Sequence, residues 1–206
     1  MELSSNKICI QIFTKAPIEG YCKTRLAPHL GESETVSLQM EMIQKTILTS
    51  IKINTADVQL WCKPSTQHSF FQKMAEENSV SLHEQKGETL GDIMNDAALG
   101  AENSYANIVQ IGTDCPYIDA DYILAAIDQL DADNRIVIGP ANDGGYVLLA
   151  QNQCFAEIYN NIDWGMPSVL GQLEMNLKHL KIKHFKLASL SDIDTFSDYQ
   201  QWKITK

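Results

Sequence analysis

Strand-like and helix-like segments alternate along most of this 206-residue chain, and this alternation constrains the fold more than any other feature. Short runs of β-branched and aromatic residues are typical of strands, whereas the longer segments between them place apolar residues three and four positions apart, as amphipathic helices do. Consecutive strands joined by a helix form parallel pairs. The alternation therefore predicts an α/β protein with a mixed, mostly parallel sheet and helices on both faces. Strands are predicted over 7–14, 58–62, 80–85, 108–112 and 135–139, and helices over 31–51, 64–77, 87–105 and 119–130.

The part of the chain after residue 139 follows a different pattern. Only the turn-forming sequence Asn-Asp-Gly-Gly separates the strand 135–139 from the apolar run 146–150, which predicts an extra strand, antiparallel if the turn is a hairpin. A helix within 164–180, a strand over 182–187 and a last helix over 195–202 complete the prediction, with the last helix capped near Asp194 or Thr195. No internal repeat or linker is evident, so residues 1–206 are expected to form a single domain.

Acidic residues outnumber basic ones, since Asp plus Glu is 26, Lys plus Arg is 16, and the net charge is −10. This charge argues against a nucleic-acid partner or an anionic membrane surface. No apolar run approaches the roughly 18 residues of a membrane span. The five cysteines are scattered and never in a C-x-x-C spacing, which is typical of reduced thiols and makes the cytoplasm the expected location. The sequence pattern does not specify an oligomeric state.

A basic loop follows the first predicted strand. Lys15, Lys23 and Arg25 lie within eleven positions of one another at the carboxyl end of that strand, with Gly20 and Thr24 in the same loop. Cations and exposed backbone amides at a strand end are what binding a phosphate or diphosphate requires. The loop is not a Walker P-loop, because the glycines of that pattern are missing. A solvated basic turn remains the alternative interpretation.

The strand 108–112 runs directly into Gly-Thr-Asp-Cys-Pro, which places Thr113 and Asp114 at its carboxyl end. Ligands of open α/β sheets bind at this edge. A carboxylate there is a hard oxygen ligand suited to Mg²⁺ or Mn²⁺, and Mg²⁺ usually takes one or two carboxylates together with substrate phosphates. Asp114 could instead cap a following turn.

Two further acidic segments are predicted near strand ends. Asp143 precedes the pair Gly144 and Gly145, which permits a close approach of the backbone to a ligand but is equally typical of a plain hairpin turn. Asp192 and Asp194 lie at alternate positions of an extended segment, so their side chains point to the same side. Either acid could complete a divalent site while the other caps the last helix.

Four stretches occur in an order that resembles a known family: KAPIEGYCKTRLAPHLG, IGTDCP, GPANDGGY and DIDT. Together they are similar to the DUF2064-type family of bacterial GT-A-like proteins within the nucleotide-diphospho-sugar transferase superfamily. The resemblance covers nearly the whole chain. It implies a three-layer, Rossmann-like GT-A fold, a divalent cation, and a sugar nucleotide or an NTP as substrate.

The resemblance also implies roles for individual residues. Lys15, Lys23 and Arg25 would contact phosphates, and Asp114 would take the position of the superfamily's metal-binding acid. Asp143, together with Asp192 or Asp194, would complete the site.

The expected function is metal-dependent glycosyl transfer from a nucleotide-diphosphate sugar, with Mg²⁺ or Mn²⁺ as cofactor and a small-molecule acceptor that the sequence does not identify. Asp143 is the candidate base or additional ligand. Two alternatives remain open. One is nucleotidyl transfer from an NTP to a phosphorylated or carboxylated small molecule, with release of pyrophosphate. The other is nucleotide binding without catalysis.

Overall fold

The computed structural model describes residues 7–205 and contains one seven-stranded sheet in the order β3-β2-β1-β4-β6-β5-β7. All neighbouring strands are parallel except β6, which runs antiparallel to both β4 and β5. This arrangement confirms the predicted α/β class, the mostly parallel sheet and the antiparallel strand after the Asn-Asp-Gly-Gly turn. The strands are β1 (Ile8–Lys15), β2 (Ala56–Lys63), β3 (Ser81–Glu84), β4 (Asn107–Gly112), β5 (Ile136–Pro140), β6 (Tyr146–Gln151) and β7 (His184–Lys186).

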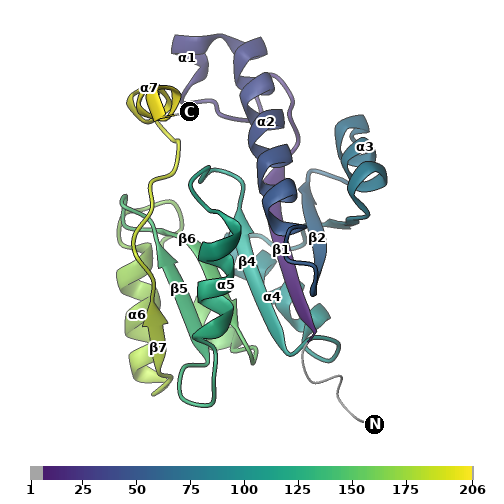
Figure 1. Cartoon of the computed structure of the whole chain (residues 1–206). Helices are drawn as coiled ribbons and strands as arrows, with labels where there is room; N and C mark the ends of the chain where they lie inside the picture. The colour runs from purple at the N-terminus through teal and green to yellow at the C-terminus, as the bar shows by residue number, and fades with distance from the viewer. Residues whose placement is uncertain (1–6, 206) are drawn as a thin grey trace.

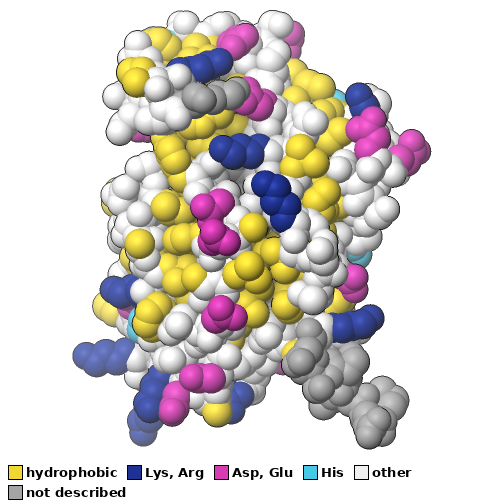
Figure 2. Space-filling model, viewed as in Figure 1, with side chains coloured by type: hydrophobic (Ala, Val, Ile, Leu, Met, Phe, Trp, Pro, Cys, Tyr) yellow, Lys and Arg dark blue, Asp and Glu magenta, His cyan; other side chains and the backbone are white. Residues whose placement is uncertain are grey.

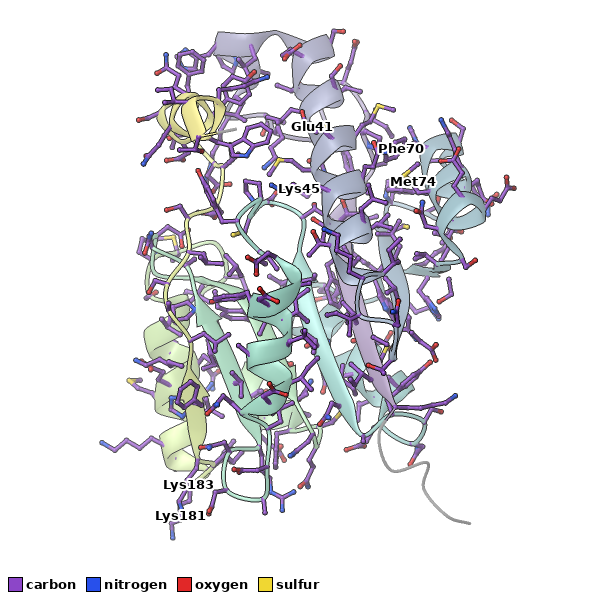
Figure 3. All side chains as sticks on the ribbon, viewed as in Figure 1. Glu41, Lys45, Phe70, Met74, Lys181 and Lys183 are labelled. Atoms are coloured by element: carbon purple, nitrogen blue, oxygen red, sulfur yellow. The ribbon has the colours of Figure 1, made fainter. Side chains whose placement is uncertain are left out.

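Helices cover both faces of the sheet and complete three layers (Figure 1). α2, α3 and α5 pack on one face, and α4, η1 and α6 pack on the other. Figure 3 shows Phe70 and Met74 of α3 directed toward α2, and both side chains are buried. The helices are α1 (Ala27–Leu30), α2 (Glu32–Ser50), α3 (Ser69–Asn78), α4 (Leu90–Ala101), α5 (Ala120–Asp128), the 3₁₀ helix η1 (Ala156–Tyr159), α6 (Val169–His179) and α7 (Phe196–Thr205).

The core follows the two-residue period of the strands. Ile10 and Ile12 of β1 pack with Ile43 and Ile47 of α2, and all four side chains are fully buried. The odd-numbered residues of β1 face the other layer, where Gln11 donates from Nε2 to the carbonyl oxygen of Ala97 in α4 at 2.7 Å. Both faces of β1 are therefore covered, which explains why its sequence is apolar without a polar solvent face.

Two helices begin later than the apolar periodicity predicts, and local hydrogen bonds account for both starts. α3 begins at Ser69 rather than at the proline-led position 64, because the His68 side chain accepts from the Phe70 amide. α4 begins at Leu90 because Thr89 and Asp92 form a reciprocal capping box. α6 lies within the predicted range 164–180 and begins at Val169, after turns that include Gly165 at φ +82°.

The last helix begins where the sequence predicts. The Asp198 amide donates to Thr195 Oγ1 at 3.3 Å, and the Thr195 amide donates to Asp198 Oδ2 at 2.7 Å. α7 then packs against the amino-terminal part of α2, whereas β7 lies toward the other end of the molecule (Figure 1). The extended segment before α7 consequently crosses the carboxyl edge of the sheet.

The surface charge is unevenly distributed over the molecule. Figure 2 shows Lys and Arg side chains gathered around the lower end of α6 and β7, and Figure 3 places Lys181 and Lys183 there. This end is opposite to α1 and α7 (Figure 1). Within residues 7–205, no helix has both the length and the apolar character needed to cross a membrane.

Candidate active site

A cavity of about 640 Å³ opens at the carboxyl edge of the sheet, where β1, β4 and the turn between β5 and β6 end. This volume is in the range typical of small-molecule sites. The topology brings the predicted segments together there, because β1 and β4 are parallel neighbours and β6 begins at the same edge. Nine of the predicted residues line the cavity: Lys15, Lys23, Thr24, Arg25, Thr113, Asp114, Asp143, Gly145 and Asp194.

Lys23 links the basic loop to the end of β4. Its ammonium lies 2.6 Å from Asp114 Oδ1 and donates to the carbonyl oxygen of Ile193 at 2.8 Å. The lysine side chain is 5% exposed, whereas that of Asp114 is 54% exposed. Lys23 also adopts the left-handed backbone conformation, at φ +48°, which costs a residue with a side chain about 1 kcal/mol or more. The ion pair and the carbonyl contact hold this residue in place.

Three carboxylates gather beside the cavity, and two of them, Asp143 and Asp194, line it directly. One oxygen from each of Asp143, Asp192 and Asp194 lies within 4.8 Å of the others. Asp143 is exposed and the other two are half-buried. The turn after β5 reaches the segment before α7 because Asn142 donates from Nδ2 to Ser191 Oγ at 2.8 Å and from its amide to the Leu190 carbonyl at 2.9 Å. Asp114 is not part of this triplet.

The three acids lie close enough together to raise one another's pKa values and could hold a cation. Burial, followed by the charges of Asp143 and Asp194, raises the pKa of Asp192 from 3.8 to about 6. Burial and the charge of Asp114 likewise raise the pKa of Asp194, and Lys23 and Arg25 only partly offset this rise. The ionised cluster thus repels itself. Hard carboxylate oxygens at this spacing fit Mg²⁺ or Mn²⁺, and bound positive charge would relieve the repulsion.

The remaining cations of the basic loop lie at the cavity mouth. Arg25 Nη1 is 2.9 Å from Asp194 Oδ2, and the arginine side chain is 72% exposed, so this pair can open to accept an anion. Lys15 is exposed at the end of β1 and has no ion pair within residues 7–205. Thr24 is exposed beside them, whereas Gly20 lies outside the cavity lining, at the loop tip, with φ +70°.

Thr113 and Gly144 occupy supporting positions. Thr113 is 3% exposed, and its hydroxyl lies 3.2 Å from that of Thr14, so it joins β4 to β1. Gly144 has φ +95°, and a Cβ there would overlap the carbonyl oxygen of Pro167. The adjacent Gly145 amide donates to Asp143 Oδ1 at 2.9 Å. Glycine is therefore required at position 144 for the backbone of this turn.

Several cavity residues do not belong to the predicted motifs. Gln39 of α2 and Gln85 after β3 reach the end of β1, and Leu90, Trp164 and Met166 form an apolar part of the wall. Strand-end position could have indicated Gln85, but no local signal marks Gln39 in the middle of a helix. A smaller hollow of about 190 Å³ adjoins the cavity and includes Asp192 in its lining.

Solved structures share this fold over nearly the whole chain. A protein of Desulfovibrio desulfuricans G20, provisionally described as a nucleotide-diphospho-sugar transferase, has a TM-score of 0.88 and 24% identity, with 97% of this chain and 87% of that chain covered. The 4-diphosphocytidyl-2C-methyl-D-erythritol synthase of Anaerococcus prevotii DSM 20548 has a TM-score of 0.65 and 10% identity, with coverages of 98% and 100%. CMP:2-keto-3-deoxy-manno-octonic acid synthetase complexed with CTP has a TM-score of 0.63 and 10% identity, with coverages of 97% and 98%.

A comparison with curated proteins gave no match. Residues 46–166, which are more than half of the sequence, match the family described as "Uncharacterized protein conserved in bacteria (DUF2064)". These residues include β4, Asp114 and Asp143. The structural matches confirm the predicted nucleotide-diphospho-sugar transferase type of fold, and the sequence match confirms the predicted family. The chain belongs to the DUF2064 family.

Proposed function

We propose that this protein is a metal-dependent glycosyltransferase that uses a nucleotide-diphosphate sugar as donor. The observation that carries the proposal is the cluster of Asp143, Asp192 and Asp194, of which Asp143 and Asp194 line the cavity together with the cations Lys15 and Arg25. Carboxylates that hold a divalent cation and cations that face it are the two components needed to bind a diphosphate. The similarity of the fold to that of nucleotide-diphospho-sugar transferases supports the same substrate class.

In this reaction the acidic and the basic residues of the site would have separate roles. Asp192 and Asp194 hold Mg²⁺ or Mn²⁺, which when bound neutralises negative charge on the diphosphate leaving group. Lys15 and Arg25 would contact the phosphate oxygens, so positive charge is in place where negative charge develops. Asp143, which is exposed at the cavity mouth, serves as the third ligand or accepts a proton from the acceptor hydroxyl.

Asp114 has a different place in the proposal from the one that the sequence suggested. Its carboxylate is paired with Lys23 at 2.6 Å, while its charge contributes to the raised pKa values of Asp192 and Asp194. We assign it to holding Lys23 and the basic loop beside the cation site. Direct ligation by Asp114 stays a prediction, and would require the carboxylate to turn away from Lys23.

The test measures turnover of a panel of nucleotide-diphosphate sugars with and without Mn²⁺, detected as release of nucleoside diphosphate. Asp194→Asn should lower the metal-dependent rate by at least tenfold, because it removes a charged ligand of the cation. The matched control is Asp96→Asn, at an exposed position of α4 away from the cavity. Equal turnover in the presence of EDTA, or an unaffected Asp194→Asn variant, would refute the metal-dependent reaction.

Nucleotidyl transfer is a second candidate, and a specific observation favours it. Two of the similar structures are a diphosphocytidyl-methylerythritol synthase and a CMP-sugar synthetase complexed with CTP. The same residues would then act on an NTP, with Lys15 and Arg25 on the departing pyrophosphate. The products separate the candidates, because pyrophosphate forms only in nucleotidyl transfer. A protein that binds nucleotide with Mg²⁺ but turns over no donor would instead be a non-catalytic binder.

A further inference from the structure

Large apolar side chains line part of the cavity and stay open to solvent. Leu90, the first residue of α4, is 43% exposed, and Met166, in the turns before α6, is 58% exposed. Trp164 packs against α4 beside Leu90, since a Cβ on Gly91 would come within 2.7 Å of its ring. The Trp164 ring also meets Tyr146 edge-on, with 6.4 Å between the ring centroids. Leu90, Tyr146, Trp164 and Met166 form an apolar wall, to which the proposed chemistry gives no role.

The apolar wall continues into the smaller hollow of about 190 Å³. Leu90 and Tyr146 line the hollow as well as the cavity, and Met94 and Val147 extend its apolar lining. An apolar cavity of about 150 Å³ can bind benzene. The hollow therefore has room for one aromatic ring or a short branched chain.

Two side chains with neutral hydrogen-bonding groups, Gln110 and Tyr146, also line the hollow. Gln110 Nε2 donates to Gln11 Oε1 at 2.9 Å and to the Met94 carbonyl at 2.8 Å, and Gln110 Oε1 accepts from the Tyr159 hydroxyl at 3.2 Å. The Tyr146 hydroxyl donates to Met94 Sδ at 3.2 Å, and burial keeps the pKa of Tyr146 well above its usual value. A ligand with several hydroxyl groups would lose more hydrogen bonds to water than these two side chains can replace.

The charged residues of the hollow lining are acidic. Asp114 and Asp192 line the hollow, whereas no Lys, Arg or His does so within residues 7–205. The cations Lys15 and Arg25 of the cavity are assigned to the diphosphate. No basic side chain is therefore left beside the hollow to pair with a phosphate or carboxylate of a second substrate, and like charges placed together are unfavourable.

The apolar wall belongs to the same part of the fold as the candidate base. Tyr146 begins β6 only three positions after Asp143. The Leu170 amide donates to the Gly144 carbonyl at 2.9 Å, which ties the turn that carries Asp143 to the start of α6. A hydroxyl group that gives its proton to Asp143 would therefore belong to a molecule that lies against this wall.

We propose that the apolar wall and the hollow form the acceptor subsite, and that the acceptor is an uncharged alcohol or phenol on an aromatic or branched aliphatic body. Its oxygen forms a bond to the anomeric carbon of the donor sugar. The bond from that carbon to the diphosphate breaks, and the nucleoside diphosphate leaves with the electron pair. The hydroxyl proton passes to Asp143. This inference rests on the proposed glycosyl transfer and specifies its acceptor.

The test measures the binding of 2-phenylethanol, methyl glucoside and glycerol 3-phosphate by ligand-observed NMR in the presence of Mg²⁺. The wild-type protein should bind 2-phenylethanol about tenfold or more tightly than the other two, because only its body matches an apolar surface. Leu90→Gln and Met166→Gln should each weaken this binding severalfold. Their matched controls are Leu99→Gln on α4 and Met175→Gln on α6, at exposed positions outside the cavity and the hollow, and these should bind like the wild type.

Circular dichroism verifies that each variant is folded. Tighter binding of glycerol 3-phosphate or methyl glucoside, or equal losses in the variants and their controls, overturns the inference. Displacement of 2-phenylethanol by AMP, CMP, GMP or UMP, with nucleotide affinities that also fall in Leu90→Gln, assigns the wall to the nucleobase and overturns it as well. The donor assay is separate. If 2-phenylethanol binds at the wall but no nucleotide-diphosphate sugar is turned over, the proposed function fails, and the acceptor role fails with it.

Discussion

Replacing Asp192 by asparagine should stabilise the metal-free protein and at the same time greatly reduce its stabilisation by metal. Asp192 is half-buried and faces two other carboxylates, and burial and these charges raise its pKa from 3.8 to about 6. A raised carboxyl pKa means that the native state favours the protonated form. The protonated carboxyl therefore contributes to the free energy of unfolding. This contribution is complete at a pH below the pKa of Asp192 in the unfolded chain, and it is lost as the pH rises through about 6. At pH 7.5 the ionised side chain therefore destabilises the native state.

The magnitude follows from the size of this shift. The rise in the pKa of Asp192 from 3.8 to about 6 would correspond to roughly 3 kcal/mol of unfolding free energy if the group were fully buried. Solvent screening of a half-buried carboxylate reduces this to about 1 kcal/mol. In a protein of this size, that gain raises Tm by roughly 2–4 °C. Mn²⁺ at about a hundredfold excess over its Kd would stabilise the wild-type protein by about 2.7 kcal/mol, and the variant by much less.

The assay is thermal unfolding followed by circular dichroism at pH 5.0 and 7.5, each with EDTA and with Mn²⁺. Asp192→Asn should raise the EDTA Tm at pH 7.5 and have little effect at pH 5.0, where the wild-type carboxyl is already largely protonated. The control variant, Asp96→Asn, lies away from the acidic triplet and should change neither value. A variant that is less stable than the wild type in EDTA at pH 7.5, or equally stabilised by Mn²⁺, would contradict the reasoning.

Three further predictions concern the elements around the site. Lys23→Met should lower the free energy of unfolding, measured by urea titration, by about 2 kcal/mol, because the variant lacks the charged hydrogen bonds of the buried ammonium to Asp114 and the Ile193 carbonyl. The control Lys45→Met, at an exposed position, should leave the free energy of unfolding unchanged. Gly144→Ala should destabilise the protein by about 2 kcal/mol or more through overlap with neighbouring backbone, whereas Gly171→Ala, in open space on α6, should stabilise it by about 0.5–1 kcal/mol; equal effects would argue against the steric explanation. Burial raises the pKa of Cys62 to about 12, so peptide mapping after iodoacetamide treatment at pH 8 should find Cys62 modified only in urea, and rapid modification of the native protein would contradict its burial.

The strand ends show why local sequence predicts a good part of the site. An apolar run that stops at a glycine marks the end of a buried strand, and parallel strands bring such ends to one edge. This reasoning placed Lys15 and Asp114 at the edge where the cavity lies. Helix starts were less accurate, because the side-chain caps of His68 and Thr89 take precedence over apolar periodicity.

The sequence by itself determined the class of the fold and the identity of the chemically distinctive residues. Periodicities of two and 3.6 residues are local properties, so they can be counted along the chain. They predict the sheet, its helical layers and the turn that carries Asp143. They also indicate that the acids and the basic loop lie at strand ends.

Only the tertiary structure decided which of these residues meet. Asp143 joins Asp192 and Asp194 because the Ala141–Leu190 bridge aligns two segments that are distant in sequence. Asp114 instead pairs with Lys23 of the basic loop. Nor does any local pattern predict that an amide from the middle of α2 reaches the end of β1. Such contacts depend on hydrogen bonds and packing between distant segments, and the physical reason they escape sequence reasoning is that no short-range periodicity encodes them.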